Sequence, residues 1–218
     1  MEIIDEINRR HADFVASLGI EIGKVTEEQL AGLSKWNMVR LYEVFYQQVF
    51  DLYVKFMFER AVFSEVPEEF DWPICIIGAL SNEAIYDSGM SHISKKKPLD
   101  IIIRLNQGRD LWTFNYIVYT PVDFDGSKKK VFASANKMKA DNVDILMFRE
   151  RWILGLFIHW LTGLHIDREG ITFTGSRDLA GNVIGVGFNG GHTIIVGIYN
   201  SSYIYNGLYF RKAFSLIP

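Results

Sequence analysis

The hydrophobic pattern of the chain changes its period near residue 65, and this change constrains the fold more than any other feature. Before it, apolar residues recur every three or four positions, the spacing of helices that bury one face. After an acidic connector at 65–71, short β-branched and aromatic runs alternate with turn-forming residues. The sequence therefore predicts a helical part, residues 1–65, followed by a mixed, mainly β part, residues 66–218.

The C-terminal part of the chain has the pattern of consecutive antiparallel strands. Segments rich in Gly, Asn and Asp separate runs of β-branched and aromatic residues at 171–174, 183–188, 193–199 and 203–210. Asn189-Gly190 lies between two of these runs, and an Asn-Gly pair is a strong signal for a tight hairpin turn. The pattern predicts a C-terminal β-meander.

One further helix is expected inside the β part, at 143–161, where apolar residues again follow helical spacing. Asn142 or Asp144 could cap its N-terminus. The predicted fold class is α+β: the helical part packs on a mainly antiparallel sheet that contains this inserted helix. A length of 218 residues fits a single domain spanning the whole chain.

The helix expected to begin near Ser34 has an apolar surface wider than an ordinary surface helix needs. One apolar stripe runs along it from Met38 to Phe56 at spacings of three and four. A second stripe beside it contains Val39, Tyr46, Phe50, Tyr53 and Met57. Such a helix is either central to the core or uses part of its surface to contact another chain, so the second stripe supplies the candidate interface residues.

Charge and hydropathy argue against several classes of protein. The 23 Lys and Arg residues against 26 Asp and Glu residues give a net charge of −3, which disfavours a nucleic-acid-binding protein. The longest uncharged apolar stretch, 152–166, is shorter than the roughly 20 residues that a transmembrane helix needs. The acidic N-terminus lacks the pattern of a signal peptide. We expect a protein of the cytoplasm or of an assembled particle, with no membrane span.

Metal and thiol chemistry find little support in the sequence. Cys75 is the only cysteine and has apolar neighbours, which predicts a buried, unreactive thiol. His159, His165 and Asp167 could surround a metal ion if the chain turned at Gly163, but histidines in an apolar segment are more often core residues. We therefore expect neither a metal nor a cofactor.

Polar side chains are concentrated in the loops of the predicted C-terminal sheet. The candidate ligand-binding residues are His165, Asp167, Arg177, Asp178, Asn189 and His192. The planar guanidinium group of Arg177 suits a carboxylate or phosphate, although Asp178 could occupy it instead. If these loops converge at one end of the sheet, the six residues would line a polar pocket.

No complete set of catalytic residues is visible, and the high aromatic content of 14% is typical of interfaces. We expect a non-enzymatic interaction or assembly protein whose partners are proteins, chiefly copies of itself. The alternative is an enzyme or small-ligand-binding protein that uses the loops of the C-terminal sheet.

Overall fold

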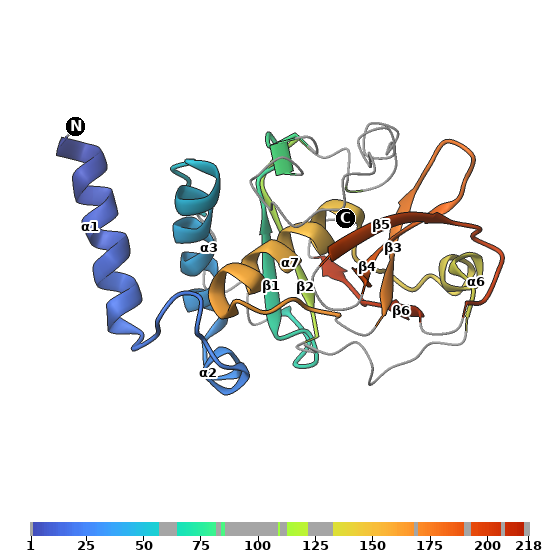
Figure 1. Ribbon diagram of the computed structural model, residues 1–218, viewed down its shortest axis with the longest axis horizontal. Helices are drawn as coiled ribbons and strands as arrows, with labels where there is room; N and C mark the ends of the chain where they lie inside the picture. Colours follow the sequence, from blue (N-terminus) through green and yellow to red (C-terminus); the bar gives the residue numbers. More distant parts are fainter. Residues whose placement is uncertain are drawn as a thin grey trace.

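The computed structural model describes residues 2–56, 65–81, 84–85, 109, 113–121, 133–167, 170–189, 193–205 and 208–215 (Figure 1). The helices are α1 (Glu2–Ser17), α2 (Glu27–Ala31), α3 (Lys35–Phe50), α6 (Ala135–Ala140) and α7 (Phe148–Thr162). The strands are β1 (Trp72–Ile76), β2 (Tyr116–Thr120), β3 (Ile171–Arg177), β4 (Val183–Asn189), β5 (Thr193–Tyr199), β6 (Leu208–Phe210) and β7 (Phe214–Ser215). The predicted α+β class, with N-terminal helices and C-terminal strands, is confirmed.

The strands form two sheets, with the orders β1-β2-β7 and β5-β4-β3-β6. In the second sheet β3, β4 and β5 pair as successive antiparallel neighbours, as the meander prediction requires. The prediction of a fourth meander strand at 203–210 is wrong. In the described part of this range, β6 is the only strand, and it pairs in parallel with β3 rather than with β5.

Aromatic packing holds the segment after β5 against the second sheet. The hydroxyl of Tyr205 accepts a hydrogen bond from the Asn200 amide at 3.1 Å, so the chain turns immediately. The ring of Tyr205 then packs edge-on against Tyr199 and Phe173, on β5 and β3. Tyr205 therefore lies against β5 and β3, and the next strand, β6, pairs with the edge of β3 away from β4.

Helix α7 begins later than predicted, at Phe148, and Met147 rather than Asn142 or Asp144 is its N-cap. The residues before it are extended because their backbone bonds to other segments. The Leu146 amide donates to the Arg211 carbonyl at 3.0 Å, and the Leu146 carbonyl accepts from Gly175 at 2.9 Å. These bonds join the start of α7 to the second sheet.

Helix α3 ends at Phe50, whereas its apolar stripes predicted a helix reaching Met57. Asp51 adopts a left-handed conformation with φ of 54°, and the Leu52 amide bonds back to the Tyr46 carbonyl at 3.1 Å. A left-handed residue is a common way for a helix to end. The chain then folds back along α3, where Glu43 accepts a hydrogen bond from the Phe56 amide at 2.8 Å.

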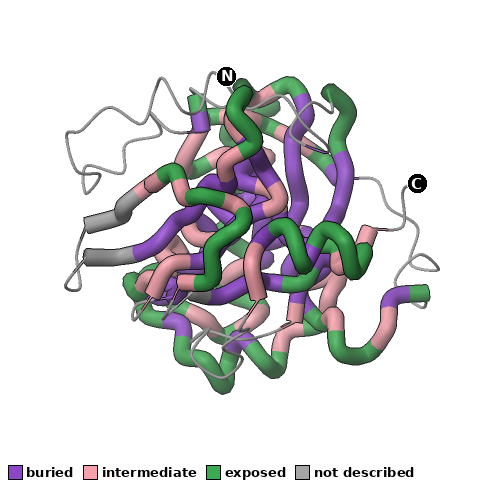
Figure 2. Tube along the Cα trace, turned by 90° about the vertical axis from the view of Figure 1, so that its right-hand side faces the viewer, coloured by how far each residue is buried: buried purple, intermediate pink, exposed green. Residues whose placement is uncertain are grey.

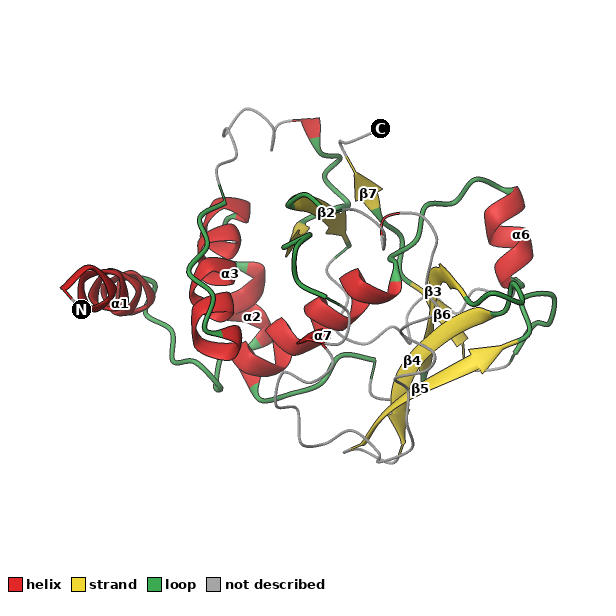
Figure 3. Ribbon diagram, turned by 90° about the horizontal axis from the view of Figure 1, so that it is seen from above, coloured by secondary structure: helices red, strands yellow, loops and turns green. Residues whose placement is uncertain are grey.

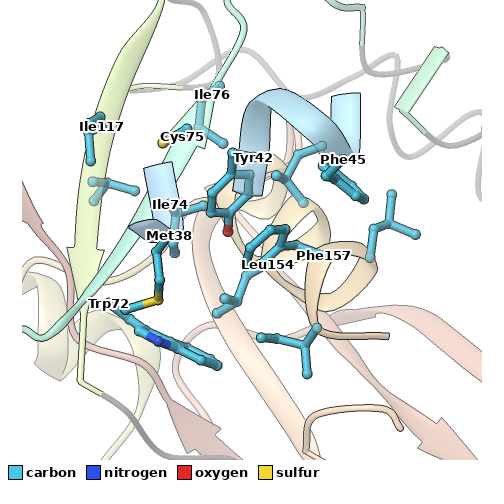
Figure 4. Close-up of a cluster of buried hydrophobic side chains, with 14 of the residues drawn as sticks. Met38, Tyr42, Phe45, Trp72, Ile74, Cys75, Ile76, Ile117, Leu154 and Phe157 are labelled. Carbon is cyan, nitrogen blue, oxygen red and sulfur yellow. The ribbon is translucent and has the colours of Figure 1, made fainter. Parts of the chain in front are cut away.

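The main core lies where α3, α7 and the first sheet meet (Figures 3 and 4). Buried residues are concentrated in the interior, and exposed ones lie mainly at its periphery (Figure 2). The Tyr42 ring of α3 stacks on Phe157 of α7 with centroids 3.7 Å apart, and the Tyr46 hydroxyl donates to the Cys75 carbonyl at 2.8 Å. Cys75 is fully buried, and this burial raises the pKa of its thiol, in agreement with an unreactive role.

Two tyrosines one turn apart on α3 offer a matched test of this core. Both Tyr42 and Tyr46 are fully buried, but among the described residues the Tyr42 hydroxyl has no hydrogen-bond partner. We expect Tyr46→Phe to lower the free energy of unfolding by about 1 kcal/mol, and Tyr42→Phe to leave it unchanged or raise it. Urea unfolding of both variants checks this, and an equal loss in both would contradict the difference in hydrogen bonding.

Candidate functional site

The guanidinium group of Arg177, the leading ligand-binding candidate, donates hydrogen bonds to backbone carbonyls of the same chain. It ends β3, is almost fully buried, and donates to the Ala135 carbonyl of α6 at 3.0 Å and to the Gly181 carbonyl at 3.5 Å. Burial lowers the pKa of this guanidinium group. Arg177 therefore anchors α6 to the second sheet.

Asp178 stabilises the turn between β3 and β4. Its carboxylate accepts hydrogen bonds from the backbone amides of Ala180 at 2.9 Å and Asn182 at 2.8 Å, and from the Asn182 side chain at 3.1 Å. Such bonds are typical of turn aspartates. Asp178 does not pair with Arg177, so the predicted competition between these two residues does not occur.

Among the described candidates, Asn189 lies at the opposite end of the sheet from Arg177. Arg177 pairs with Val183 at the first residue of β4, whereas Asn189 is the last residue of that strand and pairs with Thr193. The side chain of Asn189 and the whole of His192 lie outside the described residues. Arg177 and Asn189 therefore lie at opposite ends of β4.

Asp167 lies at the centre of a buried charge cluster. It follows α7 with φ of 57°, and its carboxylate is fully enclosed. Arg151 donates from Nε to Oδ2 at 2.9 Å, Arg211 from Nη2 to Oδ1 at 2.5 Å, and the Thr172 hydroxyl to Oδ2. Burial would raise the pKa of Asp167, but the guanidinium groups of Arg211 and Arg151 hold it well below its usual range. The carboxylate is therefore ionised at neutral pH.

The cluster joins segments that are far apart in sequence. Arg151 is on α7, Asp167 is in the connection to β3, Thr172 is on β3 and Arg211 follows β6. Burial and the neighbouring charge of Arg211 lower the pKa of Arg151, and Asp167 offsets only part of that effect. Two cations thus share one carboxylate.

A second buried charge cluster is centred on Glu150, the residue before Arg151 on α7. Glu150 accepts from Arg109 at 2.6 Å and 3.0 Å, from the Tyr116 hydroxyl at 3.2 Å and from the Met147 amide at 2.8 Å. Arg109 also donates to Asp144 at 2.8 Å. Burial alone would lower the pKa of Arg109, but Glu150 and Asp144 raise it above its ordinary value. Here two carboxylates share one cation, the reverse of the Asp167 cluster.

Sequence reasoning missed these arginines, although a signal was present. Arg149, Glu150 and Arg151 are consecutive charged residues at the start of a helix whose other side chains are mostly apolar. All three are buried. A helix that is apolar on every side is itself buried, so charges on it need partners from other elements.

His165 is half-buried and lies near Arg151, a member of the Asp167 cluster. The ring of His165 stacks on that of His159, with centroids 4.2 Å apart. His165 also lines a small cavity between α7 and β4 with Arg151 and Gly155. Among the described residues, no group of three or more His, Cys, Asp or Glu side chains is placed to hold a metal ion. Two of the candidates, His165 and Asp167, lie near a common feature, the side chain of Arg151.

The candidate interface residues of the second apolar stripe differ in how far they are buried. Val39 and Tyr46 are fully buried within the chain, because α3 packs against α7 and β1. Phe50 is half-buried and packs on the core, while Tyr53 is 41% exposed. Met57 lies outside the described residues. Val39 and Tyr46 are therefore core residues, and of the stripe members that the structure describes, Tyr53 is the exposed one.

Helix α1 carries exposed apolar side chains that α3 lacks. It lies at one end of the molecule, beside α3 (Figures 1 and 3). Phe14 is buried under Arg40, whose guanidinium carbon is 4.0 Å from the ring centroid, and His11 and Asn8 bond to Gln47 at 3.0 Å and 2.8 Å. Toward the N-terminus, Ile3 is 77% exposed and Ile4 is 47% exposed.

No helix among the described residues is long and apolar enough to cross a membrane. Comparison of the chain with protein-family models, with curated protein sequences and with solved structures gives no match.

Proposed function

We propose that the protein is a non-enzymatic interaction or assembly protein that associates with copies of itself through the N-terminal end of α1. The observation that carries this proposal is the exposure of Ile3 and Ile4, at 77% and 47%, on the stripe of α1 that elsewhere packs on the protein. We call Ile3, Ile4 and the half-buried Ile7 the α1 overhang.

The overhang continues an established packing face. Phe14, Val15 and Leu18 of the same stripe contact the core, and Ile7 and Ile3 follow at spacings of seven and four residues. Contacts from Asn8 to Gln47 and from Phe14 to Arg40 show that α1 runs antiparallel to α3.

The two helices end at different levels. At 1.5 Å per residue, α1 extends about 9 Å beyond Asn8, while α3 extends about 4.5 Å beyond Gln47. The first turn of α1 therefore reaches past the end of α3, which leaves an apolar helix face available to a partner.

The exposed area sets the expected strength of association. Full burial of an isoleucine contributes about 1.5–3 kcal/mol, so the partly exposed Ile3 and Ile4 of two copies supply on the order of 6 kcal/mol together. Loss of translational and rotational freedom opposes this with at least about 4 kcal/mol. The association is therefore weak and is best sought at high protein concentration.

Sedimentation velocity over a wide concentration range tests the proposal. We expect the average mass of the wild-type protein to rise with concentration, and the Ile3→Asp/Ile4→Asp double variant to remain monomeric. Leu179→Asp is the matched control, because Leu179 is 71% exposed in the turn between β3 and β4. It should behave as wild type.

Two results would overturn the proposal. The first is a wild-type protein that stays monomeric at the highest concentration. The second is a double variant that associates as strongly as wild type. Circular dichroism should show unchanged helix content in the double variant, because Phe14 still anchors α1.

A further inference from the structure

Strand β5 forms one edge of the second sheet, with β4 beside it (Figure 3). Among the described strands it pairs with β4 alone, through all 7 of its residues. A strand carries backbone N–H and C=O groups along both of its sides. The side of β5 away from β4 therefore presents groups that can bond to a further strand.

The solvent exposure of β5 shows that this edge is open. Val196, Gly197 and Tyr199 are half-buried, and Ile198 is 46% exposed. Their partners on β4, residues 183–186, are all buried. Exposure thus rises from β4 to β5, as expected at the accessible edge of a sheet.

Glycines keep the ring of Tyr199 away from the backbone of this edge. A Cβ atom at Gly185 or at Gly197 would lie 2.7 Å from Tyr199 Cε2, so the ring lies over both positions. Because Gly185 is on β4, the ring leans inward across the sheet. Gly197 itself has no side chain, and a glycine within a strand permits another backbone to approach closely.

The edge also lacks the residues that protect free edges. Soluble proteins commonly place lysine, other charged residues or proline there, which prevents pairing with another chain. Residues 193–205, which include β5 and the loop after it, contain no charged residue and no proline. In this loop Tyr203 and Ile204 are 63% and 58% exposed. An accessible, uncharged edge beside exposed apolar side chains is typical of a site that binds a strand.

We propose that β5 binds an extended segment of a partner protein, which joins the second sheet as an additional antiparallel strand. The backbone groups of the edge require an extended chain, and the lack of charge favours an uncharged segment rich in β-branched and aromatic residues. Binding at β5 is separate from self-association through α1, which lies at the other end of the molecule (Figure 1).

The strand β4 indicates the kind of segment that β5 accepts. It pairs with β5 in antiparallel register along the whole strand and carries no charged residue. In a folded second copy, β4 lies between β3 and β5 and is not available for this pairing. A segment with the pattern of β4 must therefore come from an extended part of another protein.

Isothermal titration calorimetry with a β4-sequence peptide tests the proposal. The probe is a synthetic peptide of Val183–Asn189 with two added lysines at each end for solubility. The protein is the Ile3→Asp/Ile4→Asp variant, so that association through α1 does not contribute. We expect saturable binding of one peptide per chain. A peptide of the same sequence methylated at every backbone nitrogen should not bind, because it cannot donate hydrogen bonds to the edge.

One substitution on β5 and one elsewhere form a matched pair. Ile198→Lys places a charge on the edge and should weaken binding of the peptide by at least about tenfold. Because Ile198 is exposed, the melting temperature should stay unchanged, which separates lost binding from lost folding. Leu179→Lys changes an equally apolar, exposed residue in the turn between β3 and β4, and should bind as tightly as the unsubstituted protein.

Hydrogen exchange followed by nuclear magnetic resonance locates the bound peptide. Alternate N–H groups of β5 point away from β4, and we expect these groups alone to exchange more slowly when the peptide is added. Absence of saturable binding, or equal binding of the methylated peptide, would overturn the proposal. So would protection of β5 that rises with protein concentration without peptide, because a second copy would then cover the edge.

Discussion

Replacing Asp167 by Asn is expected to lower the free energy of unfolding by about 3–5 kcal/mol, because it removes the negative charge that pairs with two buried guanidinium groups. Arg151 and Arg211 are both almost fully buried and both donate to this carboxylate. The amide keeps the shape of the side chain but carries no charge. Urea unfolding followed by circular dichroism measures the loss.

A surface substitution of the same chemical type is the control. Asp141→Asn breaks an exposed ion pair with Lys137, and such pairs contribute about 0–1 kcal/mol. If unpaired charge causes the effect, Asp167→Asn combined with Arg151→Met should be less destabilised than the sum of the single variants. A loss below about 1 kcal/mol in Asp167→Asn would contradict the described charge cluster.

Acid provides a second measure of the same cluster. The pKa of Asp167 is well below its usual range in the folded protein, so its contribution to stability is complete above the unfolded pKa of about 3.9. That contribution is lost as the pH falls below about 4 toward the folded pKa. The difference in unfolding free energy between wild type and Asp167→Asn should therefore be constant from pH 7 to pH 5 and shrink at lower pH.

Phe45→Ala is expected to lower the free energy of unfolding by about 3–5 kcal/mol. Phe45 is fully buried, and its ring contacts those of Phe157 and Trp160 on α7 at centroid distances of 5.5 Å and 5.6 Å. Truncation leaves a cavity between α3 and α7 and removes these contacts. The midpoint of urea unfolding gives the result.

Tyr203→Ala provides a comparison for this truncation. Tyr203 is also an aromatic residue but is 63% exposed, so its truncation should change stability by about 0.5 kcal/mol or less. Similar losses in both variants would mean that Phe45 does not lie in the core between the two helices.

The fold class could be predicted because local pattern and global packing agree over most of the chain. The Asn189-Gly190 signal lies beside the junction of β4 and β5, and β3, β4 and β5 pair as the successive antiparallel strands that the sequence predicts. Each of these features depends on residues a few positions apart. Sequence reasoning therefore finds them without knowledge of distant contacts.

Long-range contacts decide the features that could not be predicted. Asp51 ends α3 in a left-handed conformation that the apolar spacing does not reveal, and Glu43 then holds Phe56 against the helix. In the same way, β6 pairs with β3, and Tyr205 packs on Phe173, although the partners in each contact are distant in sequence.

The candidate site shows the same difference between local patterns, which the sequence reveals, and long-range contacts, which it does not. His165 and Asp167 were singled out from the sequence, but their neighbours Arg151 and Arg211 come from α7 and from the segment after β6. The apolar stripe of α1 was also visible as a pattern. Its partial exposure was not, because that depends on where α3 ends beside it.

Pulsed electron paramagnetic resonance on a spin-labelled Ala16→Cys variant tests self-association through α1 most directly. Ala16 is exposed and lies on the helix face opposite Ile7, so a label there leaves the α1 overhang intact. Cys75, the only natural cysteine, is buried and should not react with the label. At high protein concentration we expect a defined distance between labels on two copies, which disappears when Ile3→Asp and Ile4→Asp are added. A signal without any defined distance in the Ala16→Cys protein would contradict self-association through α1.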